Sequence, residues 1–526
     1  MRQKWFRELL RRRIFIIIML VIQGAALILF ISNASKLTHR TALFLYFVSV
    51  IVCLKVVSSQ EKPTYKLLWV FLIMLFPIFG GLLYLLVVLQ SSSRNMNKHI
   101  QQLEEKGQSQ MVGYADVSDV LHKEYAPCMS YLNNFGFPAY QNTECMFFPT
   151  GESAFIKILE ALKNAKHYIF LEYFIIQDGK MWSSIYSILK EKAKQGVRIR
   201  VLYDDIGCFL TLPKNFPAML HDDGIECKVF NPFRPILSSI QNNRDHRKIL
   251  SVDGRIAITG GFNLADEYIN EIPKHGYWKD TGILLSGEAA WSLTVMFLQM
   301  WDLVSGTDED YTLYLPPKTP HTSGNADGFV QPYCDSPLDR EHIGEHVYLQ
   351  IINNAREYLY IYTPYLIVDD SMISALTLSA KSGVDVRIIT PYHWDKHFVH
   401  LNTQAYYRRL IESGVKVYEY EPGFLHAKVF VSDDKVATVG SINMDYRSLY
   451  LHFECGVYLY KNNSIGDIKR DFLSTLKVSR QITLQECQRS FFVRLLQTIL
   501  DKGIMPSEKV LDFPVDCNTL TGSVNL

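Results

Sequence analysis

A motif that occurs twice with the same spacing is the strongest constraint on how this chain folds. It comprises a histidine, a lysine two positions later, then an aspartate, a glycine and an asparagine. The fixed residues are His246, Lys248, Asp253, Gly260 and Asn263 in the first copy, and His426, Lys428, Asp433, Gly440 and Asn443 in the second. Because each residue type fills roughly one position in twenty, chance recurrence of the whole set is negligible. The chain therefore contains two copies of one structural unit.

The segments before the two motif copies repeat an order of helices and strands. The expected helices are residues 151–165, 182–195, 346–355 and 371–382, and the expected strands are residues 168–175, 197–203, 358–362 and 384–389. Such alternation is typical of βαβ units. We therefore expect an α/β fold with two pseudo-symmetric lobes, each a mixed, largely parallel sheet flanked by helices.

The motif itself predicts a β-hairpin. Apolar runs at residues 248–252 and 255–259 are separated by Asp253 and Gly254, a pair that favours a tight turn. Residues two apart on a strand share a face, so His246 and Lys248 should point to the same side. The aspartates belong to the motif and are therefore candidate catalytic residues. Their position in the turn favours a structural role instead.

Residues 1–92 have the composition of a membrane segment. Apolar runs cover residues 14–31, 41–57 and 67–89, and a helix that spans a bilayer needs about 20 apolar residues. We expect two or three transmembrane helices, because the second run is shorter than the others and contains Lys55. The length of the first run argues against a cleaved signal peptide. Basic residues before the first run favour a cytoplasmic N-terminus. Three full spans would then place the large C-terminal part outside, whereas a re-entrant or hairpin unit formed by the second and third runs would reverse this.

The other boundaries follow from local composition. Residues 93–113 are polar and charged and are expected to form a linker helix, and the Pro- and Gly-rich residues 316–328 to connect the lobes. The first lobe then comprises residues 114–315 and the second residues 329–526.

Charge and cysteine content exclude several classes of protein. The formal net charge of the 526 residues is +1, so there is no large basic field for a nucleic acid. The nine cysteines show no CxxC pair and therefore predict neither a zinc site nor a disulfide framework. We expect no metal and no cofactor.

The residue types of the motif suit the cleavage of a phosphodiester. This reaction needs a nucleophile, a proton donor for the leaving alkoxide, and positive charge on the non-bridging oxygens. One histidine can attack in its neutral form while the other donates a proton. Lys248, Lys428, Asn263 and Asn443 can bind the phosphoryl oxygens. The sequence thus predicts a metal-independent site that contains both motif copies.

An attacking imidazole also needs a partner that fixes its tautomer. Two carboxylates, Asp280 and Glu454, lie in or near expected strands that could run beside the motif. Glu454 stands among apolar neighbours, which is unusual for a solvated carboxylate. We predict that both orient the histidines, with a structural salt bridge as the alternative.

The paired motifs resemble the signature of the phospholipase D superfamily. Residues 242–248, residues 278–281 and the apolar N-terminus are similar to bacterial cardiolipin synthases in particular. The resemblance extends from about residue 40 to the end of the chain. The run at residues 14–31 precedes the two-span unit of that family.

The resemblance implies transfer of a phosphatidyl group. One histidine attacks phosphatidylglycerol and releases glycerol. A second phosphatidylglycerol then accepts the phosphatidyl group to give cardiolipin. His246 is the expected nucleophile and His426 the acid and base, although the reverse assignment satisfies the motif equally. The expected partners are phosphatidylglycerol and other phospholipids. The resemblance also implies a multi-pass protein of the bacterial plasma membrane. The oligomeric state stays open.

Three other functions fit parts of the pattern. A membrane-anchored phospholipase D would use the same residues to hydrolyse its lipid. A nuclease of the superfamily would need a basic surface, which the near-neutral charge and the apolar runs of this chain disfavour. A non-enzymatic scaffold would not require the intact histidines, lysines and asparagines in both copies.

Overall fold

The structure is a computed structural model that describes residues 39–59, 63–76, 80–81, 84–85, 91–111, 126–233, 239–316, 328–339 and 341–487. Two compact units are present. Among the described residues, the smaller lies within residues 39–85 and the larger within residues 91–487. Both motif copies lie in the larger unit.

The smaller unit contains two apolar helices that pack on each other, α2 (His39–Val57) and α3 (Pro63–Leu75). They cover the second expected run and the beginning of the third. Among the described residues, no helix has the length and apolar character needed to cross a membrane. The run at residues 14–31 lies outside the described residues.

The first lobe is built on a seven-stranded sheet with the order β1-β9-β7-β6-β2-β3-β4. Its strands are β1 (Thr143–Phe148), β2 (Tyr168–Tyr173), β3 (Arg198–Asp204), β4 (Glu226–Phe230), β6 (Lys248–Val252), β7 (Ile256–Gly260) and β9 (Gly282–Gly287). Its main helices are α7 (Gly151–Asn164), α8 (Lys180–Lys194), α10 (Phe216–Asp222) and α11 (Ala290–Ser305). The expected βαβ units are thus present.

The second lobe repeats this scheme in a sheet with the order β10-β19-β17-β16-β11-β13-β14-β20. Its strands are β10 (Phe329–Asp335), β11 (Tyr358–Tyr362), β13 (Asp385–Pro391), β14 (Lys416–Tyr420), β16 (Val429–Ser432), β17 (Val436–Gly440), β19 (His452–Tyr460) and β20 (Ser479–Gln481). Its main helices are α12 (Ile343–Asn354), α13 (Asp370–Lys381), α14 (His397–Glu412) and α16 (Ser464–Leu476). The α/β fold with two related lobes is confirmed.

The expectation that the sheets are largely parallel is wrong. In the first sheet only β2 with β3 and β3 with β4 pair in parallel, and the other pairs are antiparallel. The second sheet follows the same pattern around β11, β13 and β14. The reason is the motif: its two strands form a hairpin, and a tight turn can join only antiparallel strands.

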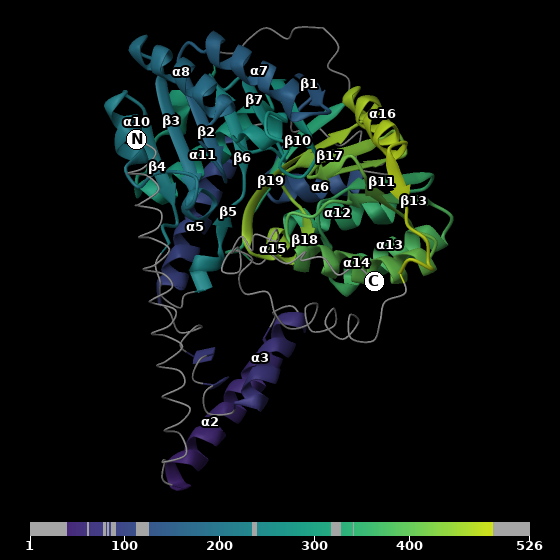
Figure 1. The fold of residues 1–526 in the computed structure, drawn as a ribbon. Coiled ribbons are helices and arrows are strands. Elements are labelled where there is room, and N and C mark those ends of the chain that lie inside the picture. The colour runs from purple at the N-terminus through teal and green to yellow at the C-terminus, as the bar shows by residue number, and fades with distance from the viewer. Residues whose placement is uncertain are drawn as a thin grey trace, which may run out of the picture. The chain divides into compact units, whose positions relative to one another are not determined.

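The two lobes form one continuous body. Strands β17 and β19 pack against β7 and β9, so the two sheets lie side by side (Figure 1). One cluster of buried apolar side chains extends through both lobes. Close packing of this kind holds the lobes at a fixed mutual position, which any site between them requires.

Helix α5 (Ser91–Gln110) coincides with most of the expected linker helix and packs on α11. Trp291 Nε1 donates to the carbonyl of Gln110 at 2.9 Å, and Gln299 Nε2 donates to that of Leu103 at 3.0 Å. Lys106 forms a salt bridge with the buried Asp302 at 3.0 Å. The helix is therefore an integral part of the first lobe. Of the expected inter-lobe linker, residues 317–327 lie outside the described residues.

Candidate active site

Two short parallel strand pairs that cross between the lobes position the motif histidines. Strand β5 (Arg244–Asp245) pairs with β19 of the second lobe, and β15 (Gly423–Leu425) pairs with β8 (Tyr277–Lys279) of the first. The backbone N–H of His246 then donates to the Phe453 carbonyl at 2.9 Å, and that of His426 donates to the Lys279 carbonyl at 2.7 Å. A backbone hydrogen bond therefore links each histidine to the opposite lobe.

The same crossing gives each histidine a carboxylate partner from the other lobe. His246 Nδ1 lies 2.8 and 3.0 Å from the two carboxylate oxygens of Glu454. His426 Nδ1 lies 2.7 Å from Asp280 Oδ2. If each Nδ1 carries the proton and donates it to the carboxylate, each Nε2 keeps a free lone pair. The structure thus places Asp280 and Glu454 where orienting residues must stand.

The carboxylates are themselves held, in a different way in each lobe. Ser441 Oγ donates to Glu454 Oε2 at 2.5 Å. The matching motif position in the first lobe is Gly261, where a Cβ atom would come within 2.1 Å of Asp280 Oδ1. That oxygen instead accepts from the backbone N–H of Thr281 at 2.8 Å. The motif copy with glycine therefore leaves room for Asp280, and the copy with serine donates a hydrogen bond to Glu454.

The motif lysines and asparagines are buried. Lys248 and Lys428 each donate to the carbonyl of the histidine two residues earlier. Asn263 Nδ2 donates to the hydroxyl of Tyr268 at 2.7 Å, so this amide group already has a partner. Asn443 Oδ1 has no hydrogen-bond partner among the described residues. Both motif lysines and Asn263 therefore already contact groups of the protein, and a phosphate would compete with these contacts.

Burial governs the protonation of the site. It lowers the pKa of His246 well below its ordinary value, and the charges of Lys248 and His452 lower it further. Burial, followed by the charge of Lys428, lowers the pKa of His426 to about 4. It also lowers the pKa of Lys248 to about 8 and that of Lys428 to about 7. A bound anion would offset these effects by stabilising every protonated form.

We therefore predict that anion binding weakens as the pH rises. Below about pH 7 both lysines are cations, and each loses its charge as the pH passes its lowered pKa. Sulfate does not titrate in this range, so its dissociation constant reports the site alone. We expect the affinity to fall by about tenfold or more between pH 6.5 and pH 8.5, because binding then requires proton uptake. Isothermal titration calorimetry measures it, and an affinity independent of pH would contradict the assignment.

The two motif aspartates lie in the hairpin turns. Asp253 accepts hydrogen bonds from the backbone N–H groups of Lys166, His167 and Tyr168, each at 2.8 Å. Asp433 does the same for residues 356–358, at 2.8 to 3.0 Å. Both residues have a positive φ, 51° and 55° respectively. These contacts tie each turn to the first residues of the neighbouring strand, and they support the structural role over the catalytic one.

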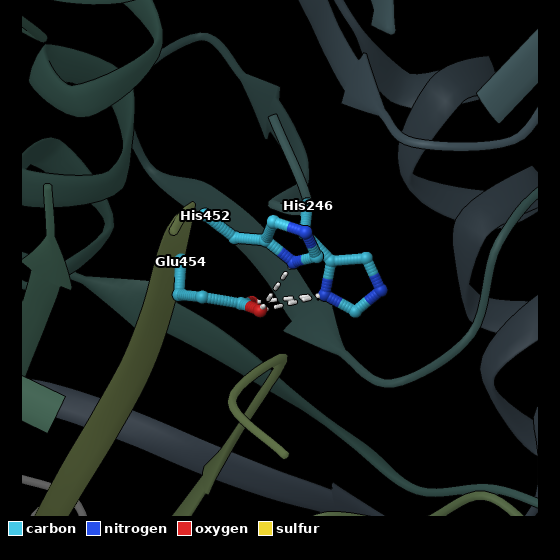
Figure 2. Close-up of side chains that lie close together, drawn as sticks. All are labelled: His246, His452 and Glu454. Carbon is cyan, nitrogen blue, oxygen red and sulfur yellow. Dashed lines mark hydrogen bonds and ion pairs between the residues drawn. The ribbon is translucent and has the colours of Figure 1, made fainter. Parts of the chain in front are cut away.

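His452 was missed from the sequence. Its ring lies 5.5 Å from that of His246, centroid to centroid, and its Nδ1 lies 3.7 Å from Glu454 Oε1 (Figure 2). It stands outside the motif, so spacing within the motif could not reveal it. Its position two residues before Glu454, on the same face of a strand, is the signal that was available.

His246, His452 and Glu454 are close enough to share a metal ion, since their candidate ligand atoms lie within 4.8 Å of one another. The nearby charges oppose this. Lys248 and Lys428 act electrostatically on His246, and two ammonium groups in a buried site repel a dication while they attract an anion. The arrangement favours an anionic ligand.

Comparisons with known proteins agree with this architecture. A family described as "Cardiolipin synthase, PLD-like domain" matches residues 158–276 and again residues 348–476. A family described as "Phospholipase D-nuclease N-terminal" matches residues 44–87. The repeated match coincides with the two lobes.

Curated relatives align over most of the chain. An uncharacterized protein of Streptococcus mutans is 43% identical over 86% of this chain and 98% of its own length. Cardiolipin synthase 2 of Bacillus anthracis is 37% identical over 81% of this chain and 83% of its own length. The crystal structure of phosphatidylserine synthase from Haemophilus influenzae covers 72% of this chain and 97% of its own with a TM-score of 0.54. At 14% identity this last likeness concerns the fold alone.

Proposed function

The chain belongs to the cardiolipin synthase family of phospholipase D-like proteins, and from that premise we propose that it converts two molecules of phosphatidylglycerol into cardiolipin and glycerol. The observation that carries the proposal is the pair of buried histidines, each held at Nδ1 by a carboxylate of the opposite lobe. Two such imidazoles can act as nucleophile and as acid and base, and the two lysines can stabilise the charge of the phosphoryl group, so that one phosphodiester is exchanged for another.

In the first step, His246 Nε2 attacks the phosphorus of phosphatidylglycerol. The bond from phosphorus to the glycerol oxygen breaks, and that oxygen takes a proton from His426 Nε2. Lys248 and Lys428 bind the non-bridging oxygens. The products are free glycerol and a phosphatidyl group bound to His246. Asp280 supports the acid role of His426, because its carboxylate favours the protonated ring.

In the second step, the now neutral His426 removes a proton from a hydroxyl of a second phosphatidylglycerol. The resulting oxygen attacks the phosphorus, and the bond to His246 Nε2 breaks. Cardiolipin leaves, and both histidines return to their starting states. One phosphodiester has replaced another, so the reaction needs no nucleotide.

We also propose that the enzyme is a multi-pass protein of the bacterial plasma membrane. The exposed side chains of α2 and α3 support this, since Phe44, Phe47, Leu54 and Phe71 are each more than 60% exposed to solvent. A surface of this kind is stable in lipid and unfavourable in water. The apolar residues 14–31 would add a further span.

The purified full-length protein tests the function directly. It is incubated with phosphatidylglycerol vesicles and a chelator, and the products are identified by mass spectrometry. The proposal requires cardiolipin and glycerol in equal amounts. Phosphatidic acid as the main product would show a hydrolase, and an absence of turnover would contradict the enzymatic assignment.

A further inference from the structure

His452 is a buried polar side chain next to His246. The residue is 9% exposed, and neither of its ring nitrogens has a partner among the residues that the structure describes. Glu454 is the nearest acceptor, but the 3.7 Å separation from Nδ1 is too long for a hydrogen bond. Its two oxygens already accept from His246 and Ser441. Buried polar groups are normally hydrogen-bonded, so an unpartnered buried histidine indicates a bound ligand.

The pseudo-symmetry of the two lobes places a nitrogen-bearing ring at this position in both. His452 stands two residues before Glu454, and Trp278 stands two residues before Asp280. The rings occupy equivalent places: Trp278 lies 5.4 Å from His426, and His452 lies 5.5 Å from His246. A ring with a polar nitrogen therefore lies beside each motif histidine: among the described residues neither Trp278 Nε1 nor the nitrogens of His452 have a hydrogen-bond partner, and of the two rings only His452 adjoins the expected nucleophile.

The buried polar ring destabilises the folded protein unless a ligand forms hydrogen bonds with its nitrogens. An unsatisfied buried donor or acceptor destabilises a protein by about 1–3 kcal/mol. Figure 2 shows the ring of His452 beside that of His246 at the point where both approach Glu454. The 5.5 Å between the two ring centroids leaves a phosphoryl group on His246 close enough to extend an oxygen toward His452.

We propose that His452 donates a ring N–H hydrogen bond to a phosphoryl oxygen of the group bound at His246, as a third phosphate ligand beside the two motif lysines. The ligand follows from the proposed function, and the hydrogen bond deepens it by adding a substrate-contacting residue that the motif does not contain. A neutral donor suits this place. Burial and the charges of Arg447 and Lys248 hold the pKa of His452 well below its ordinary value, so the ring adds a donor without a further positive charge.

The test compares sulfate binding by the wild-type protein with that of His452→Phe, which keeps the ring and removes the nitrogens. We expect about tenfold weaker binding of sulfate by calorimetry, the usual effect of one lost hydrogen bond to a charged group. The thermal-unfolding midpoint should stay the same or rise, because an unsatisfied polar group disappears. His452→Asn, which retains an N–H donor, should recover part of the affinity.

His342→Phe is the matched control. His342 also lies in the second lobe, but its ring packs on Tyr450, at 4.9 Å between centroids. This variant should bind sulfate as the wild type does. Equal sulfate affinity of His452→Phe and wild type would overturn the proposal, and so would a wild-type protein that binds no sulfate. Binding of one Zn²⁺ per chain that is lost in His452→Phe, with sulfate binding unchanged, would show a metal site instead. None of these readouts needs lipid turnover, so they stand apart from a failure of the proposed function.

Discussion

Replacing either motif histidine by alanine should reduce the formation of cardiolipin by about a thousandfold or more. His246→Ala removes the atom that bonds to phosphorus, and His426→Ala removes the proton donor for the leaving glycerol. Both rings are buried and hydrogen-bonded to a carboxylate of the other lobe. A water molecule that takes the place of either ring would not be held in the position that the reaction needs. The rate of cardiolipin formation from phosphatidylglycerol vesicles measures the effect.

His346→Ala is the control for this pair. His346 is partly exposed and bonded at Nδ1 to Glu341, at 2.7 Å, so it has the same kind of partner but lies outside the site. Its loss should leave the rate unchanged. Thermal unfolding establishes that each variant is folded. More than a few per cent of wild-type activity in either His246→Ala or His426→Ala would rule out a mechanism that uses both histidines.

The second large effect is expected from the carboxylates that cross between the lobes. In Glu454→Gln and Asp280→Asn the new amide can donate to Nδ1, which favours the tautomer with the proton on Nε2. That tautomer has no lone pair for attack or for proton removal. We expect a loss of about a hundredfold to ten-thousandfold in kcat, with a smaller change in KM, because such partners act mainly on the orientation and charge of the ring.

Glu341→Gln is the matched control, since it breaks a carboxylate–histidine pair of the same kind on the surface. It should retain full activity. Each carboxylate variant must also bind sulfate, which shows that the lysines are still in place. A Glu454→Gln enzyme with a wild-type kcat would mean that the hydrogen bond between the lobes is only structural.

Much of this site follows from local sequence. The hairpin was predicted because Asp253 and Gly254 favour a turn between two apolar runs, and β6 coincides with the expected strand. Glu454 was predicted from its apolar surroundings. In each case the signal lies within a few residues of the feature.

Other features depend on contacts between distant segments, which periodicity does not encode. The pairing of Glu454 with His246, rather than with the histidine of its own lobe, arises because β5 adds to the edge of β19. The motif hairpin accounts for one antiparallel pair in each sheet, and a further antiparallel pair arises in each because β9 and β19 return beside the hairpins. His452 became a candidate only once its ring was placed beside His246.

The central claim is that a phosphatidyl group is carried on a histidine of the first lobe. Rapid acid-free quenching after mixing with phosphatidylglycerol labelled at phosphorus, followed by proteolysis and mass spectrometry, locates the label. The account predicts an acid-labile, base-stable label on His246 in the wild type and none in His246→Ala. A label on His426, on another residue, or one that survives acid would contradict it.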